Sequence, residues 1–114
     1  NVESSTISTP GTFIDKYSFP RPEVQAVTLS SVSIQLDLQI GKVVRADNTS
    51  GGALALALPR ADKYKFLSGH ITNVGGANDI RVETDAFGAT LVTLTPGQTC
   101  AWFTDGTSYR AFVL

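Results

Sequence analysis

The segment VSIQLDLQI at residues 32–40 decides the fold class of this 114-residue chain. Apolar and polar side chains alternate through it without interruption, and the apolar ones are Val32, Ile34, Leu36, Leu38 and Ile40. Successive side chains of a β-strand point to opposite faces of its sheet. A period of two over the whole segment therefore predicts a strand with one buried face.

Shorter segments on the C-terminal side repeat this alternation, from ALALAL at 53–58 to YRAFVL at 109–114. Turn-forming pairs such as Gly51-Gly52, Pro96-Gly97 and Asp105-Gly106 separate them. Parallel neighbours need long crossovers, usually helices, and no helix is predicted. We therefore predict an all-β fold, an antiparallel β-sandwich or jelly-roll-like domain of eight or nine short strands.

The first 25 residues differ from the rest of the chain. They are polar, and Pro20-Arg21-Pro22 favours extended backbone while lacking two donors for a sheet. We interpret residues 1–25 as an extended N-terminal arm or linker, with a short strand near 12–17. The β-sandwich domain is then expected at residues 26–114.

Composition excludes several classes of function. A formal net charge of −1 is unlike the basic excess of a nucleic-acid binder. No apolar run reaches the roughly 18–20 residues that span a bilayer, so no membrane insertion is expected. Residues 1–10 have neither the basic start nor the apolar run of a secretion signal. One cysteine rules out an intrachain disulfide and a cysteine-based zinc cluster, and we expect no metal and no cofactor.

Few residues could carry catalysis, and we expect that the protein is not an enzyme. His70 lies in a predicted strand without a nucleophile elbow nearby, so we interpret it as a surface or interface histidine. Asp79, Glu83 and Asp85 share a predicted strand face with Arg81, a pattern typical of a solvated charge ladder. We therefore predict no catalytic residue.

Two aromatic residues are the candidates for ligand contact. Trp102 and Tyr109 flank the predicted Asp105-Gly106 hairpin turn, where they can pair across strands. Aromatic rings also stack on sugars, so a glycan contact by Trp102 and Tyr109 remains the alternative interpretation. Cys100 alternates with Trp102 on one strand and is expected to be a small buried hydrophobe.

The run HITNVGGANDIRVETDAFGATLVTLTPGQTCAWFTDGTSYRAFVL at 70–114 resembles the C-terminal modules of bacteriophage tail fibres and tailspikes. The matching residues are Asn73, Gly75, Pro96-Gly97-Gln98, Asp105-Gly106-Thr107 and Tyr109. Residues 36–59 also look like the strand pair that precedes a proline in this family.

The resemblance implies a trimeric β-domain of a virion. Its expected role is host-surface attachment, fibre capping or trimer assembly, with other virion proteins and host cell-surface polysaccharide as partners. The implied location is the virion, assembled in the host cytoplasm, and the unpaired thiol of Cys100 fits such a reducing compartment. The leucine face of residues 54–58 and the final residues 112–114 are candidate surfaces of the homotrimer.

Two other interpretations stay open. A capsid decoration or head-fibre protein would have the same fold and stoichiometry, with residues 1–25 as its anchor on the capsid. A polysaccharide-active enzyme fragment is the third, although tailspike depolymerases usually use a long β-helix that 114 residues cannot contain.

Overall fold

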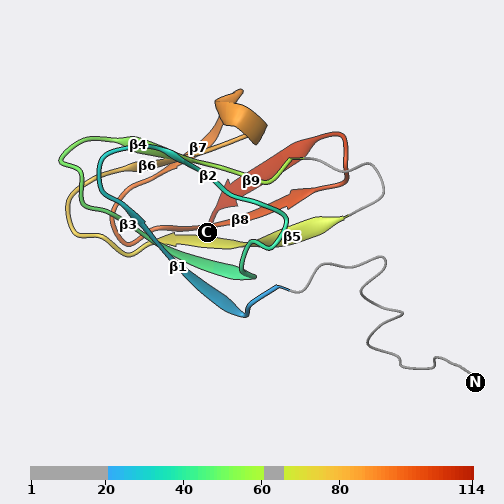
Figure 1. The fold of residues 1–114 in the computed structure, drawn as a ribbon, viewed down its shortest axis with the longest axis horizontal. Coiled ribbons are helices and arrows are strands. Elements are labelled where there is room, and N and C mark those ends of the chain that lie inside the picture. Colours follow the sequence, from blue (N-terminus) through green and yellow to red (C-terminus); the bar gives the residue numbers. More distant parts are fainter. Residues whose placement is uncertain (1–20, 61–65) are drawn as a thin grey trace, which may run out of the picture.

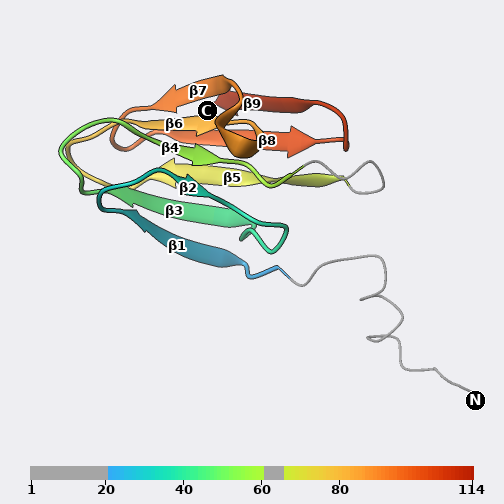
Figure 2. The ribbon, with the colours of Figure 1, turned by 45° about the horizontal axis from the view of Figure 1, so that its top comes forward.

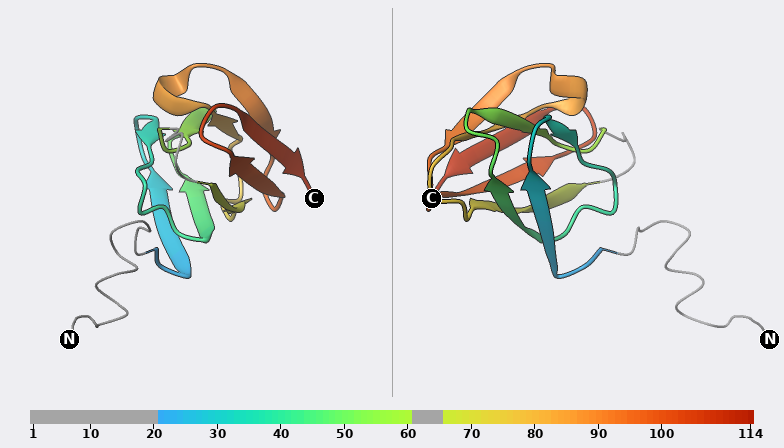
Figure 3. Two further views of the ribbon diagram at one scale, coloured as in Figure 1. Left: turned by 90° about the vertical axis from the view of Figure 1, so that its right-hand side faces the viewer. Right: turned by 60° about the vertical axis from the view of Figure 1, so that its left-hand side comes forward.

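Two β-sheets packed face to face form the domain, as the computed structural model shows for residues 21–60 and 66–114 (Figures 1 and 3). The elements of this described part are β1 (Val24–Leu29), β2 (Ile34–Gln35), β3 (Val43–Asn48), β4 (Leu54–Ala57), β5 (Leu67–Asn73), β6 (Ile80–Glu83), the 3-10 helix η1 (Asp85–Phe87), β7 (Thr90–Leu94), β8 (Thr99–Thr104) and β9 (Tyr109–Val113). The predicted all-β fold of eight or nine short strands is confirmed.

The first six strands form a parallel coil, which is clearest in Figure 2. One sheet, sheet A, has the order β1-β3-β5-β8-β9, and the other, sheet B, has the order β2-β4-β6-β7. The chain alternates between sheets as far as β6, so β1/β2, β3/β4 and β5/β6 are three successive turns. Within each sheet, the strands of successive turns pair in parallel. The last three strands are added by antiparallel pairing: β7 to sheet B, and β8 and β9 to sheet A.

The prediction of a purely antiparallel sandwich is therefore wrong. Parallel neighbours need a long crossover, and this requirement was taken to mean a helix. Here the crossover is a strand of the opposite sheet: residues 30–42 connect β1 to β3 and contain β2. Such a connection covers the inner face of one sheet with the other, so both sheets bury apolar side chains without any helix.

Apolar side chains from successive turns stack in register inside the coil. Ile34 of β2 lies beside Leu56 of β4, which lies beside Val82 of β6. Leu56 and Val82 are fully buried, and Ile34 packs against the same core. Burying a side chain of this size contributes about 1.5–3 kcal/mol. Inward-facing Trp102 of β8 is the largest fully buried side chain of the described residues.

The segment at 32–40 is not one strand, contrary to the prediction. Only Ile34–Gln35 pairs in a sheet, and the chain then turns, with the amide of Ile40 donating to the carbonyl of Asp37 at 3.0 Å. Leu36 is 5% exposed, whereas Val32 is 65% exposed. A short strand followed by a turn buries alternate apolar residues nearly as well as a continuous strand, so the pattern does not separate the two.

The domain also begins earlier than residue 26, because β1 starts at Val24. Arg21 attaches this start to the coil. Its Nε donates to the carbonyl of Ile40 at 2.7 Å, and its Nη2 donates to that of Ser68 at 2.8 Å. The remainder of the predicted arm, including the strand near 12–17, lies outside the described residues.

Two buried asparagines fix the ends of β3 and β5. The Asn48 side-chain amide donates to the carbonyls of Gly52 and Asp79. The Asn73 side-chain amide donates to the carbonyls of Asn78 and Leu94, both at 2.9 Å. Each side-chain oxygen accepts the amide hydrogen two residues on, which forms an Asx turn. Neither asparagine was predicted as buried, although each ends an alternating strand just before small turn residues.

Candidate functional site

Three phenylalanines make the outer side of sheet A an exposed apolar surface. Phe66, Phe103 and Phe112 define it, and we call it the aromatic face. Phe66 and Phe103 stack with ring centroids 5.9 Å apart, and Phe66 and Phe112 are 65% and 57% exposed. A groove of about 530 Å³ runs over this face. Large apolar rings left in water in this way mark an interaction surface more often than a free surface.

Basic side chains border the groove. Arg21, Lys42 and His70 line it beside the aromatic face. Burial lowers the pKa of the Arg21 guanidinium, but its carbonyl contacts leave it a fixed part of the groove wall. Lys42 pairs with exposed Glu23 at 3.1 Å, an ion pair that solvent screens strongly. His70 lies exposed on this outer side of sheet A, in agreement with its interpretation as a surface histidine.

Beneath the groove, the chain approaches itself closely at Gly69. A Cβ there would lie 2.7 Å from the carbonyl oxygen of Lys42 and 3.1 Å from Nε1 of Trp102. The Trp102 Nε1–H donor is buried and has no hydrogen-bond partner among the described residues. Gly69 is therefore required for the packing of the indole under the groove.

A second concave region lies beside β2, on the other sheet. This cleft, called the loop cleft below, has a volume of about 420 Å³. It combines two carboxylates, two amides and one guanidinium with apolar side chains, contributed by Gln35, Leu36, Asp37, Leu38, Gln39, Arg60 and Asp85. Its volume falls in the range of ligand pockets, about 300–1,000 Å³.

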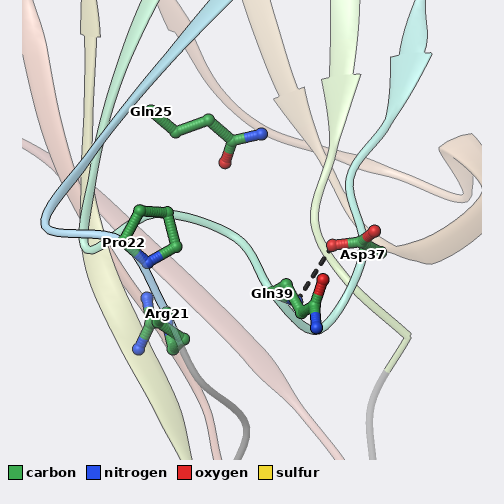
Figure 4. A pocket seen from close by; sticks show the side chains of 5 residues that line it. All are labelled: Arg21, Pro22, Gln25, Asp37 and Gln39. Carbon is green, nitrogen blue, oxygen red and sulfur yellow. Dashed lines mark hydrogen bonds between the residues drawn. The ribbon is translucent and has the colours of Figure 1, made fainter.

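A neighbouring pocket of about 550 Å³ shares one wall with the loop cleft. Figure 4 shows Arg21, Pro22 and Gln25 on one side of this pocket, with Asp37 and Gln39 on the other. The Gln25 side-chain oxygen accepts the amide hydrogen of Gly41 at 2.8 Å. An Asp37 carboxylate oxygen accepts the amide hydrogen of Gln39 at 2.9 Å, which holds the turn between the two hollows. Asp37 and Gln39 therefore border both pockets.

The turn that brings Asp85 to the loop cleft has an unusual backbone. Ala86 and Phe87 have φ angles of 55° and 59°, in the left-handed region that L-residues with a Cβ seldom adopt. Each such residue costs on the order of 1–3 kcal/mol unless its surroundings hold it. Here the side-chain oxygen of Gln35 accepts the Ala86 amide hydrogen at 2.7 Å. The Gln35 amide nitrogen also donates to the carbonyls of Leu36 and Leu58, so β2 anchors the turn.

The predicted contact residues on β8 and β9 have different environments. Trp102 is 1% exposed, so the prediction that its ring stacks on a glycan is wrong in this structure. Its neighbours on both sheets enclose it because it alternates inward with Cys100. Tyr109 is partly exposed, and its hydroxyl donates to the carbonyl of Pro59 at 2.8 Å. A glycan contact by Tyr109 stays a prediction.

Cys100 lies in the core, as predicted for a small hydrophobe. Burial raises the pKa of its thiol to about 11, although hydrogen bonding to the backbone opposes this rise. The reactive thiolate form is therefore scarce at neutral pH. In this structure the cysteine has a packing role.

The predicted carboxylate ladder is only partly a solvated one. Glu83 is buried, and its Oε2 accepts hydrogen bonds from Arg81 Nε at 3.1 Å and Thr90 Oγ1 at 2.9 Å. Asp85 lies beyond the end of β6, in η1, so it does not share that strand face. The ladder expected at 79–85 is therefore interrupted by a partly buried ion pair and a turn.

The two candidate interface surfaces also differ. Leu56 and Leu58 are fully buried, so the leucine face of 54–58 is core and the prediction that it forms an interface is wrong. By contrast, residues 112–114 are exposed, and Leu114 is 74% exposed. Phe112 belongs to the aromatic face, and Val113 and Leu114 are exposed apolar residues that follow it in the chain.

Comparisons with known proteins assign no family to the chain. Comparison with models of protein families, with curated proteins and with solved structures finds no match. Among residues 21–60 and 66–114, no three His, Cys, Asp or Glu side chains are grouped to hold a metal ion. Within the same residues, no helix has the length and apolar character to cross a bilayer.

Proposed function

We propose that the chain is a non-enzymatic virion domain, a homotrimeric module of a bacteriophage tail fibre or tailspike that attaches to the host surface. The observation that carries the proposal is the aromatic face. A single chain leaves Phe66 and Phe112 exposed to water, with Phe103 partly exposed between the two strands, whereas a second copy packed there removes this apolar surface from water. The resemblance at residues 70–114 supports the trimer and its place on a virion.

The topology supports an assembly role independently of the aromatic face. β1 and β2 are the edge strands of their two sheets, and both lie at the same end of the parallel coil. Exposed strand edges pair readily with other chains. At the opposite end β7 and β9 are the other two edge strands, each joined to its sheet by antiparallel pairing. Each sheet therefore presents a free strand edge at both ends, which suits a module that assembles with other chains.

A capsid decoration protein is the second candidate, and one observation favours it. Arg21 joins the start of the domain to three backbone carbonyls, of Ile40, Gly41 and Ser68. Tension on the chain before residue 21 would therefore be transmitted to the coil through a well-bonded side chain. An N-terminal arm bound to a capsid would need such an attachment.

The test of the trimer is the mass in solution, measured by multi-angle light scattering at micromolar concentration. We expect a trimer for the wild type and a shift to monomer for the double substitution Phe103→Ser and Phe112→Ser. Val32→Ser, which alters an exposed apolar residue outside the aromatic face, is the control and should leave the trimer intact. A monomeric wild type would refute the trimer.

The role in attachment is tested separately, with fluorescently labelled trimer on bacterial cells. Saturable binding that unlabelled protein competes away is the expected result. A trimer that binds purified capsids and no cells would replace attachment with capsid decoration. Turnover of capsular polysaccharide by the purified domain would overturn the non-enzymatic assignment.

A further inference from the structure

The loop cleft is assembled from three segments that are far apart in the sequence. Residues 35–39 supply one wall, Arg60 follows β4, and Asp85 follows β6. Leu36 and Leu38 add apolar surface between the polar groups. Convergent polar groups around an apolar floor, in a hollow of about 420 Å³, are typical of small-ligand sites.

Several polar groups of the cleft are not used by the fold. Within residues 21–60 and 66–114, no hydrogen bond or ion pair engages the Asp85 carboxylate or the Arg60 guanidinium. Asp37 uses one carboxylate oxygen for the amide of Gln39. By contrast, the Gln35 side chain is fully engaged and holds the left-handed turn at Ala86. The fold thus positions Asp85 firmly while leaving its carboxylate available to a ligand.

The chemistry of these groups indicates which ligand would fit. Carboxylates accept hydrogen bonds, a guanidinium donates them, and the Gln39 amide does both. Hydroxyl groups also do both, so a surface with several adjacent hydroxyls matches such a set. Two carboxylates against one guanidinium give the lining a negative balance, which disfavours an anion. The partly exposed Leu38 side chain matches the C–H face of a sugar ring.

We propose that the loop cleft binds a neutral, hydroxyl-rich oligosaccharide, with Asp37, Arg60 and Asp85 as its polar contacts. The inference rests on the proposed attachment function and names the surface that performs it. The aromatic face is then the contact between copies, and the loop cleft is the contact with the host glycan. The two surfaces belong to different sheets, so each can be disrupted without the other.

The test is isothermal titration of the trimer with neutral tetrasaccharides of glucose, mannose and galactose, and with tetragalacturonate as the acidic probe. We expect binding of at least one neutral probe and at least tenfold weaker binding of the acidic one. Asp85→Asn preserves the shape of the side chain and removes its charge, and it should weaken binding about tenfold. Asp37→Asn should act in the same direction.

Asp79→Asn is the matched control, since it makes the same change at the opposite end of β6 and outside the cleft. It should leave affinity unchanged, and all three variants should remain trimers. If cells are bound but Asp85→Asn and Asp37→Asn bind them like the wild type, the inference fails while attachment stands. Preference for tetragalacturonate overturns it as well. If the wild type itself does not bind cells, the proposed attachment function is refuted instead.

Discussion

The parallel coil of β1–β6 and the antiparallel end of β7–β9 both bury one face of short strands, but their strands find their pairing partners in different ways. In the coil, neighbours in a sheet come from successive turns, so Val43 of β3 pairs with His70 of β5. At the antiparallel end, β8 pairs with the next strand through a tight turn, with Thr104 opposite Tyr109. Both regions have the same alternating sequence. Alternation therefore indicates a buried face, but the pairing partner depends on what connects the strands.

Turn chemistry explains why the antiparallel end is the more predictable region. Gly97 and Gly106 have φ angles of 89° and 98°, which glycine adopts at no steric cost. Asp105 accepts hydrogen bonds from the backbone amides of Thr107 and Ser108, both at 3.0 Å. The residues of the β8–β9 turn specify a hairpin locally, whereas the turn at Gly97 leads the chain from sheet B to sheet A. In the coil, turn residues such as Gly51, with a φ of 93°, mark where a strand ends but not its partner, because the parallel pairs form only after a whole turn has closed.

The largest expected effect distinguishes a buried from an exposed position of the segment at 32–40. Leu36→Asp places an unpaired charge in the core, so we expect loss of the folded state, a cost above about 4 kcal/mol. Val32→Asp should change the free energy of unfolding by less than about 0.5 kcal/mol, because that side chain is exposed. Urea unfolding followed by circular dichroism measures both. Equal destabilisation of the two variants would restore the continuous strand that alternation predicts.

An intermediate effect is expected where the coil meets the antiparallel end. Asn73→Ala leaves the carbonyls of Asn78 and Leu94 without their donor, and we expect a loss of about 2–4 kcal/mol. Thr72→Ala, at the preceding position on β5, removes one hydrogen bond to Thr99 Oγ1 and should cost about 1 kcal/mol. The midpoint of urea unfolding gives both values. If Thr72→Ala were the more damaging substitution, Asn73 would not be the link between the two regions.

The smallest effect concerns the β8–β9 turn and depends on pH. Hydrogen bonds from the backbone of Thr107 and then Ser108 lower the pKa of the Asp105 carboxyl well below its usual range. A carboxyl whose pKa is lowered by folding adds stability above its unfolded pKa of about 3.9. That contribution disappears as the pH falls towards the folded pKa. Because the turn is exposed, solvent screening keeps the effect small.

Thermal unfolding of the wild type and of Asp105→Asn between pH 7 and pH 2 measures this contribution. We expect a higher Tm for the wild type at neutral pH and a gap that narrows below about pH 4. The narrowing is the informative result, since it isolates the charge from the shape of the side chain. A gap of constant size down to pH 2 would show that the Asp105 charge contributes nothing to the turn.

Among the candidate surfaces too, the features that depend on neighbouring residues were predictable, whereas those formed by residues distant in the sequence were not. His70 was predicted as a surface or interface histidine, because its strand lacks the nucleophile elbow that a catalytic role would need. The loop cleft was not predicted, because Asp37, Arg60 and Asp85 come from segments that only the coil brings together. The glycan contact considered for Trp102 as an alternative is wrong, because its ring faces inward with Cys100 and is buried. Phe66 and Phe103 lie far apart in the sequence and stack only because β5 pairs with β8.

By itself, the sequence determined that this protein is built from short strands with one buried face, that glycine-containing turns end its last strands, and that its lone cysteine lies in the core. Each of these follows from residues within a few positions of one another. Only the tertiary structure decided that β1–β6 form a parallel coil, that 54–58 is core, and that the outer side of sheet A is apolar. The physical reason is that side-chain alternation constrains which way a strand faces, whereas its partners depend on contacts between residues distant in the chain.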